Sequence, residues 1–116
     1  MNDAAHANHP PVPRVKGALR RTVKPGDKVL LDARDSTDPD KHSLKIEWLY
    51  YPEPGSYRGP APAIEGAFSP QASLVVPKVD TAQTIHIILI VTDQGSPPLT
   101  RYQRLILTVQ PQITRE

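Results

Sequence analysis

Proline limits what this chain can fold into more than any other residue type. Fourteen of the 116 residues are proline, and they are spread over most of the sequence. A proline inside a helix costs about 3 kcal/mol, because it removes a backbone hydrogen bond and clashes with the preceding turn. The prolines therefore argue against long helices and predict short segments separated by turns.

The size of the chain and its lack of cysteine exclude several classes of protein. A length of 116 residues is typical of one domain. Without cysteine there can be no disulfide scaffold, thiol redox site or thiolate zinc site. The longest apolar run covers five residues, 87–91, whereas a membrane-spanning helix needs about 20.

Strand-like segments recur along the chain, separated by turns rich in Gly, Pro, Asp and Ser. This pattern predicts an all-β fold, an antiparallel immunoglobulin-like sandwich of about seven strands. Segment 12–15 is interrupted by proline and suits only an edge strand. The expected segments are 12–15, 19–23, 28–33, 44–51, 63–65, 72–76, 84–93 and 101–109.

Alternation of apolar residues within these segments predicts which side chains meet in the core. Segment 84–93 is apolar on both faces, because Ile88 and Ile90 join the inward set, and we expect it to be a central strand. The predicted core residues are Val29, Leu31, Ile46, Trp48, Leu74, Val76, Ile87, Leu89, Val91, Leu105, Leu107 and Val109.

Three regions are expected along the chain. Residues 1–11 are small and polar and predict a flexible lead-in, 12–110 form the sandwich domain, and 111–116 are a C-terminal tail. Basic residues are scattered and the net charge is only +2, so we expect no nucleic-acid partner. The N-terminus lacks the apolar core of a signal peptide. If the protein is exported, the chain is a piece of a longer protein or its signal has been removed.

Acidic residues form one candidate site. Asp38 and Asp40 flank a proline in a turn, and Asp93 ends the expected central strand, so all three can lie at the same end of a sandwich. Calcium takes six to eight hard oxygen ligands, and these carboxylates would suit it. The alternative is that the aspartates only bond backbone N–H groups of their own turns. Lys41 also places a positive charge beside the expected site.

Aromatic residues form a second candidate site. Trp48 lies on an alternating strand and is expected in the core. Tyr51 alternates away from it, and Tyr57 lies in a loop rich in proline and glycine. Both could stack on sugar rings, with Glu53 and Arg58 bonding the hydroxyl groups. The alternative is that the tyrosines cover sheet edges.

Catalytic constellations are not evident in the sequence. The four histidines and six serines have no nucleophile-elbow context, and no glycine-rich phosphate loop precedes a helix. The paired aspartates lie in a turn rather than across a cleft. We therefore expect no enzymatic activity from this chain.

Several motifs resemble a known family. Residues 29–40 (VLLDARDSTDPD) resemble the LDAS-STDPDGD pattern of PKD-like and cadherin-like bacterial modules, and 91–95 (VTDQG) resembles their VTDNG. Three further segments indicate a narrower group within this superfamily, and they are residues 8–12, 48–57 and 84–102. Together they resemble the C-terminal domain of the Sde182-type cellulose-binding proteins, the DUF1593 group.

The resemblance implies a role as well as a fold. In that family a nucleoside-hydrolase-like domain precedes a small immunoglobulin-like domain. The chain would then be a non-catalytic accessory domain of an exported protein, binding cellulose or a related polysaccharide or orienting its partner domain. The alternative is a structural or protein-interaction module of the cadherin-like kind, stabilised by calcium. Neither a nucleic acid nor a membrane is an expected partner.

The resemblance also extends the candidate calcium site. Some PKD-like domains take a further ligand from an asparagine in the segment that leads into the domain, and Asn8 matches that position. One departure is visible, since Lys41 and His42 stand where the superfamily often has Gly-Asp.

Overall fold

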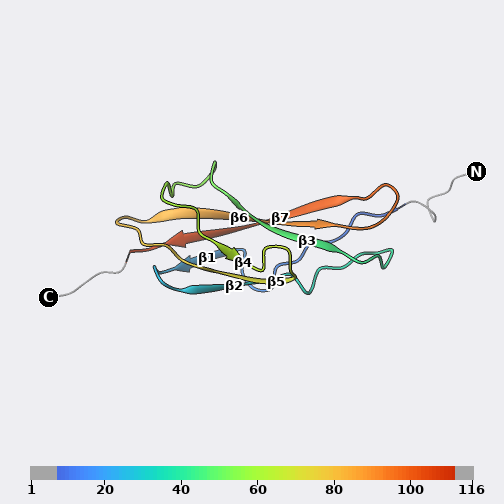
Figure 1. Cartoon of the computed structure of the whole chain (residues 1–116), viewed down its shortest axis with the longest axis horizontal. Helices are drawn as coiled ribbons and strands as arrows, with labels where there is room; N and C mark the ends of the chain where they lie inside the picture. The colour runs from blue at the N-terminus through green and yellow to red at the C-terminus, as the bar shows by residue number, and fades with distance from the viewer. Residues whose placement is uncertain (1–7, 112–116) are drawn as a thin grey trace, which may run out of the picture.

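Two β-sheets packed face to face make up the protein (Figure 1). The computed structural model describes residues 8–111, and these contain no helix. One sheet has the strand order β1-β7-β6-β3 and the other β2-β5-β4. The strands are β1 (Arg20–Val23), β2 (Lys28–Asp32), β3 (Lys45–Tyr51), β4 (Ile64–Glu65), β5 (Gln71–Val75), β6 (Gln83–Thr92) and β7 (Thr100–Val109). The prediction of an all-β sandwich is confirmed.

The two longest strands form the middle of the larger sheet. β6 lies between β3 and β7 and pairs antiparallel with both, as expected for a central strand. β1 pairs parallel with β7 at the edge of this sheet. Among residues 8–111 no helix is long and apolar enough to cross a membrane.

The core lies between the two sheets. All the residues predicted for it from strand alternation are buried. Trp48 is among them, and its indole Nε1–H donates to the carbonyl of Ser69 at 2.9 Å. A buried indole needs such a partner for its N–H. Each large side chain buried in this way stabilises the fold by roughly 1.5–3 kcal/mol.

Residues 12–15 do not form the expected edge strand. Val12 makes a single bridge to Thr37, with N–O distances of 2.7 and 3.1 Å. Pro11 and Pro13 flank Val12 and have no backbone N–H, so the ladder cannot continue. The single bridge nevertheless attaches the N-terminal segment to the loop between β2 and β3.

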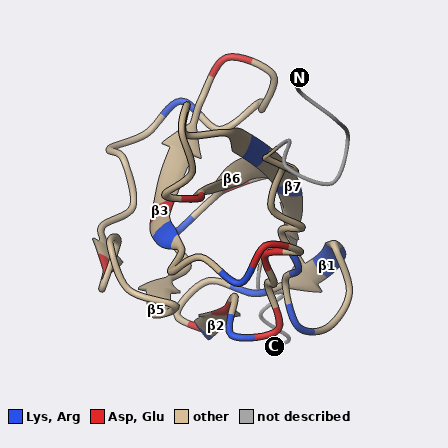
Figure 2. Ribbon diagram, turned by 90° about the vertical axis from the view of Figure 1, so that its right-hand side faces the viewer, with Lys and Arg blue, Asp and Glu red and all other residues tan. Residues whose placement is uncertain are grey.

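Three segments that are distant in sequence meet at one end of the sandwich (Figure 1, right). They are the N-terminal residues 8–12, the β2–β3 loop 35–43 and the β6–β7 loop 93–99, and we call this end the N-terminal pole. Figure 2 looks at this pole along the long axis. Lys and Arg are distributed around the sandwich in that view and do not gather on one face.

Candidate functional site

The N-terminal segment contacts both loops of the N-terminal pole. The Asn8 side-chain amide donates from Nδ2 to Asp93 Oδ1 at 3.3 Å and to the Pro97 carbonyl at 3.0 Å. The backbone N–H of His9 donates to Asp40 Oδ2 at 2.7 Å, and His9 Nδ1 lies 3.1 Å from Asp40 Oδ1. The segment therefore connects residues predicted as calcium ligands on separate loops.

Asp93 uses only one of its two carboxylate oxygens within the fold. Its side chain is almost fully buried, with the residue 1% exposed. Oδ1 accepts hydrogen bonds from the backbone N–H of Gly95 at 3.0 Å and of Leu99 at 2.9 Å. Burial raises the pKa of Asp93, but these N–H donors and the Asn8 amide outweigh it and hold the pKa below its ordinary value. The ionised carboxylate keeps Oδ2 buried and without a partner.

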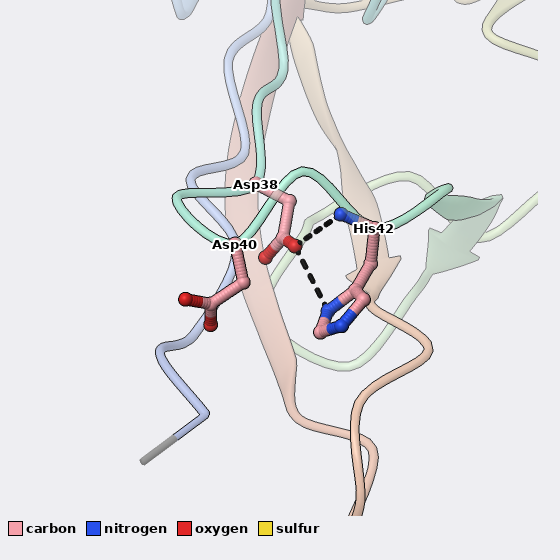
Figure 3. Close-up of side chains that lie close together, drawn as sticks. All are labelled: Asp38, Asp40 and His42. Atoms are coloured by element: carbon pink, nitrogen blue, oxygen red, sulfur yellow. Dashed lines mark hydrogen bonds and ion pairs between the residues drawn. The ribbon is translucent and has the colours of Figure 1, made fainter. Parts of the chain in front are cut away.

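Asp38 shows the same division between its oxygens. Its side chain is 1% exposed, and Oδ2 accepts the backbone N–H of His42 at 2.7 Å. His42 Nδ1 lies 3.0 Å from that oxygen but makes no hydrogen bond to it. Oδ1 is buried and has no partner. Figure 3 shows both contacts to His42, with Asp40 on the opposite side of Asp38.

Several oxygen and nitrogen donors lie at this pole. One ligand atom each from Asp38, Asp40 and His42 lie within 4.8 Å of one another. Asn8 Oδ1, Asp38 Oδ1 and Asp93 Oδ2 are buried and have no hydrogen-bond partner within the protein. Carboxylate and amide oxygens are the ligands that calcium takes in proteins.

Lys41 does not neutralise these carboxylates. Its side chain is exposed, and none of the ion pairs among residues 8–111 includes it. Its backbone has a φ of 63°, the left-handed region in which glycine is favoured. Glycine would adopt this conformation without the steric cost of a β-carbon.

The outer face of the larger sheet is the second candidate site. We define this outer face by seven of the side chains of β3, β6 and β7 that point away from the core: Glu47, Leu49, Tyr51, Ile88, Ile90, Tyr102 and Arg104. Tyr102 is 65% exposed and Tyr51 36% exposed. The Arg104 guanidinium lies 5.8 Å from the centre of the Tyr51 ring, which is within the range of a cation–π contact.

Only one of the two tyrosines predicted for sugar stacking is available to do so. Tyr51 lies on the outer face, as its alternation predicted. Tyr57 is buried, with 6% of its surface exposed, and its hydroxyl donates to the Pro60 carbonyl at 2.8 Å. The prediction that the loop presents Tyr57 outward is wrong, because the loop supplies a partner for the hydroxyl and lets the ring pack into the core.

The two polar residues predicted beside these tyrosines lie in the loop between β3 and β4. Glu53 is exposed there. Arg58 donates from Nη1 to the carbonyls of Pro52 at 3.2 Å and Tyr57 at 3.1 Å, so its guanidinium supports the loop. Neither residue lies on the strands of the outer face.

Sequence reasoning missed Tyr102 and Arg104 as binding candidates. The sequence did contain the signal for both residues, because Leu105, Leu107 and Val109 on the same strand were predicted to point inward. Alternation along the same strand then places residues 102 and 104 on the opposite side.

Comparisons with known proteins agree with this fold. The family model described as the C-terminal domain of cellulose-binding protein Sde0182 matches residues 28–109. No curated protein matches the chain. A solved nucleoside hydrolase-related hypothetical protein from Saccharophagus degradans, associated with carbohydrate metabolism, is 36% identical, with a TM-score of 0.87 over 93% of this chain.

The chain spans only 27% of that Saccharophagus protein. The solved PKD domain of the KIAA 1837 protein is 19% identical to this chain, with a TM-score of 0.61. The match covers 88% of this chain and 90% of that domain. That likeness concerns the fold alone. With a family model matching most of its length, the chain belongs to the family of the Sde0182 C-terminal domain.

Proposed function

We propose that this chain is a non-catalytic accessory domain of a longer, exported protein and that its outer face binds polysaccharide. The observation that carries the proposal is the exposure of Tyr51 and Tyr102 on one face of one sheet. The family description, which names a cellulose-binding protein, supports polysaccharide as the ligand class.

The spacing of the two tyrosines suits an extended ligand. Tyr51 pairs with His86, which pairs with Ile106 on β7, four residues beyond Tyr102. Standard strand geometry then separates the two tyrosines by about 10 Å across the sheet and about 13 Å along it. A polysaccharide crossing the strands obliquely can place one sugar ring over each aromatic side chain.

Polar groups between the tyrosines complete the site. Arg104 is two residues from Tyr102 on the same face of β7, and its guanidinium reaches the Tyr51 ring. Glu47 lies on this face of β3 and supplies acceptor oxygens. Guanidinium donors and carboxylate acceptors both bond sugar hydroxyls, while the aromatic rings cover the apolar faces of the sugar.

A second candidate function uses the same face to orient a partner domain. Leu49 is exposed, and Ile88 and Ile90 are partly exposed beside it, so the outer face has an apolar part. The related Saccharophagus protein is much longer than this chain, and its remainder is a partner of the right kind. In this case the isolated domain has no affinity for polysaccharide.

Retention on insoluble cellulose separates the two candidates. We expect the isolated domain to be retained, and Tyr102→Ala and Tyr51→Ala each to weaken retention several-fold while the far-UV circular dichroism stays unchanged. Phe68→Ala is the matched control, because Phe68 is 74% exposed in the loop between β4 and β5 and lies outside the outer face. Absence of retention, or equal retention by all variants, would contradict polysaccharide binding by this face.

A further inference from the structure

Two arginines of the larger sheet keep their guanidinium donors free. Arg104 lies on the outer face and Arg20 lies on β1, and both side chains are exposed. Among residues 8–111, neither guanidinium donates a hydrogen bond to the protein or belongs to an ion pair. By contrast, the guanidinium groups of Arg21, Arg34 and Arg58 donate to carbonyl or carboxylate oxygens of the fold. The donors of Arg104 and Arg20 are therefore available to a ligand.

The strand register places these two arginines close together on the same side of the sheet. Arg20 pairs with Ile106 on β7, and Arg104 precedes Ile106 by two residues. Paired residues share a face of a sheet, and so do residues two apart in one strand. Standard strand geometry separates the Cα atoms of the two arginines by about 8 Å. Their long side chains can therefore bind groups of one ligand.

The positive charges of both arginines act on the neighbouring part of β6. His86 pairs with Ile106, and its side chain is buried. Burial, and then the charges of Arg104 and Arg20, lower the pKa of His86 below its ordinary value. The imidazole is therefore neutral at pH 7 and does not alter the charge of this region. Two unpaired positive charges close together favour an anionic group of a ligand.

Acidic and basic side chains lie on opposite sides of the line that joins the two exposed tyrosines. A line from Tyr51 to Tyr102 passes over Ile88. Glu47 lies on one side of this line, and Arg104 and Arg20 lie on the other. A ligand along this line therefore has the two arginines beside it on one side only. The register that gives this arrangement forms three successive rows across the sheet: Glu47–Ile90–Tyr102, Leu49–Ile88–Arg104 and Tyr51–His86–Ile106–Arg20.

We propose that the polysaccharide bound by the outer face carries carboxylate groups, as uronic acid units do, and that Arg104 and Arg20 bind these groups. This inference rests on the proposed polysaccharide binding and names the chemical class of the ligand. A guanidinium can donate two parallel N–H groups to a carboxylate, and such bonds are stronger than those to neutral hydroxyl groups. The Arg104 guanidinium lies 5.8 Å from the centre of the Tyr51 ring, so a sugar stacked on this ring has its substituents beside Arg104. Arg20 binds a carboxylate that projects toward the β1 edge of the sheet.

Binding isotherms on cellulose fibres and on the same fibres oxidised at C6 test this inference. The oxidation converts glucose units into glucuronate units and leaves the polymer backbone unchanged. At low salt we expect the oxidised fibres to bind the protein on the order of tenfold more tightly, and added salt should reduce this preference. Equal binding to both fibres, with Tyr51→Ala weakened on both, would overturn the carboxylate preference alone. Absence of binding to either fibre would overturn polysaccharide binding as well.

Arg104→Gln and Arg20→Gln locate the carboxylate site. Both side chains are exposed, so we expect both variants to fold and to lose most of the preference for oxidised over unmodified fibres. Lys28→Gln is the matched control, because Lys28 is exposed on β2 in the other sheet and the change removes the same charge. This variant should keep the preference. An equal loss in Lys28→Gln would assign the preference to the net charge of the protein, and an unchanged preference in both arginine variants would contradict the site.

Discussion

Asn8 and Asp93 lie 85 positions apart in the sequence, and their side chains are joined by a hydrogen bond of 3.3 Å. Asp93 directly follows the central strand β6, whose position is fixed by pairing on both sides. Asn8 belongs to a segment with no strand of its own. The contact therefore attaches the segment that leads into the domain to the end of a strand that is held in the middle of the larger sheet.

Gly95→Ala should break this relationship without removing either partner. A Cβ at position 95 would overlap the side-chain amide of Asn8, so Asn8 must move and lose its bonds to Asp93 and Pro97. We expect a loss of about 1 kcal/mol in the free energy of unfolding, measured by urea denaturation.

Ser96→Ala is the control for this substitution. Ser96 is exposed in the same loop, so removing its hydroxyl should change stability by less than about 0.5 kcal/mol. If Gly95→Ala is as stable as Ser96→Ala, the Asn8 contact does not hold the segment.

Tyr57→Phe tests whether Tyr57 is a core residue rather than a ligand-binding one. The substitution removes only the hydroxyl that donates to Pro60, and we expect a loss of about 1 kcal/mol in stability with unchanged retention on cellulose. Tyr102→Phe removes an exposed hydroxyl and should leave stability unchanged. Weakened retention by Tyr57→Phe at unchanged stability would return Tyr57 to the binding site.

The predictable part of this fold is the part with strand periodicity. Side chains in a strand alternate strictly between two faces, so the core could be predicted residue by residue, Trp48 included. The same rule placed Tyr51 outward and could have placed Tyr102 there. The central position of β6 in its sheet could be predicted from Ile88 and Ile90, because they make this strand apolar on both faces.

Residues in irregular segments were harder to place. Tyr57 lies between prolines and glycines, where no period relates one side chain to the next, and its burial depends on a local bond to Pro60. The meeting of Asn8 with Asp93 depends on the path of a segment with a single β-bridge. Resemblance to a family suggested it, whereas composition and spacing could not.

Lys41→Gly should stabilise the protein. Lys41 has a φ of 63°, and at this φ a residue with a β-carbon is less stable than glycine by about 1–2 kcal/mol. Glycine offsets part of this difference, because it increases the conformational entropy of the unfolded chain. We expect a net gain of about 0.5–1 kcal/mol in urea denaturation. Lys41→Ala removes the same charge but keeps the β-carbon, so an equal gain in Lys41→Ala would assign the effect to charge instead.

His86 should make the stability of the protein depend on pH. Its side chain is buried on β6 between Tyr51 and Ile106 on the neighbouring strands. Burial, and then the nearby positive charges of Arg104 and Arg20, lower the pKa of His86 below its ordinary value of 6.5. The unfolded chain therefore takes up a proton near pH 6.5 that the folded protein does not.

Stability from a neutral His86 is thus fully present above pH 6.5 and declines as the pH falls toward the lower pKa of the folded state. In His86→Gln this contribution is absent, while His9 and His42 are retained in both proteins. We expect the free energy of unfolding, measured by urea denaturation between pH 7.5 and 5.5, to fall more steeply for the unsubstituted protein than for His86→Gln. Parallel pH profiles would mean that His86 binds its proton equally well in the folded and unfolded states.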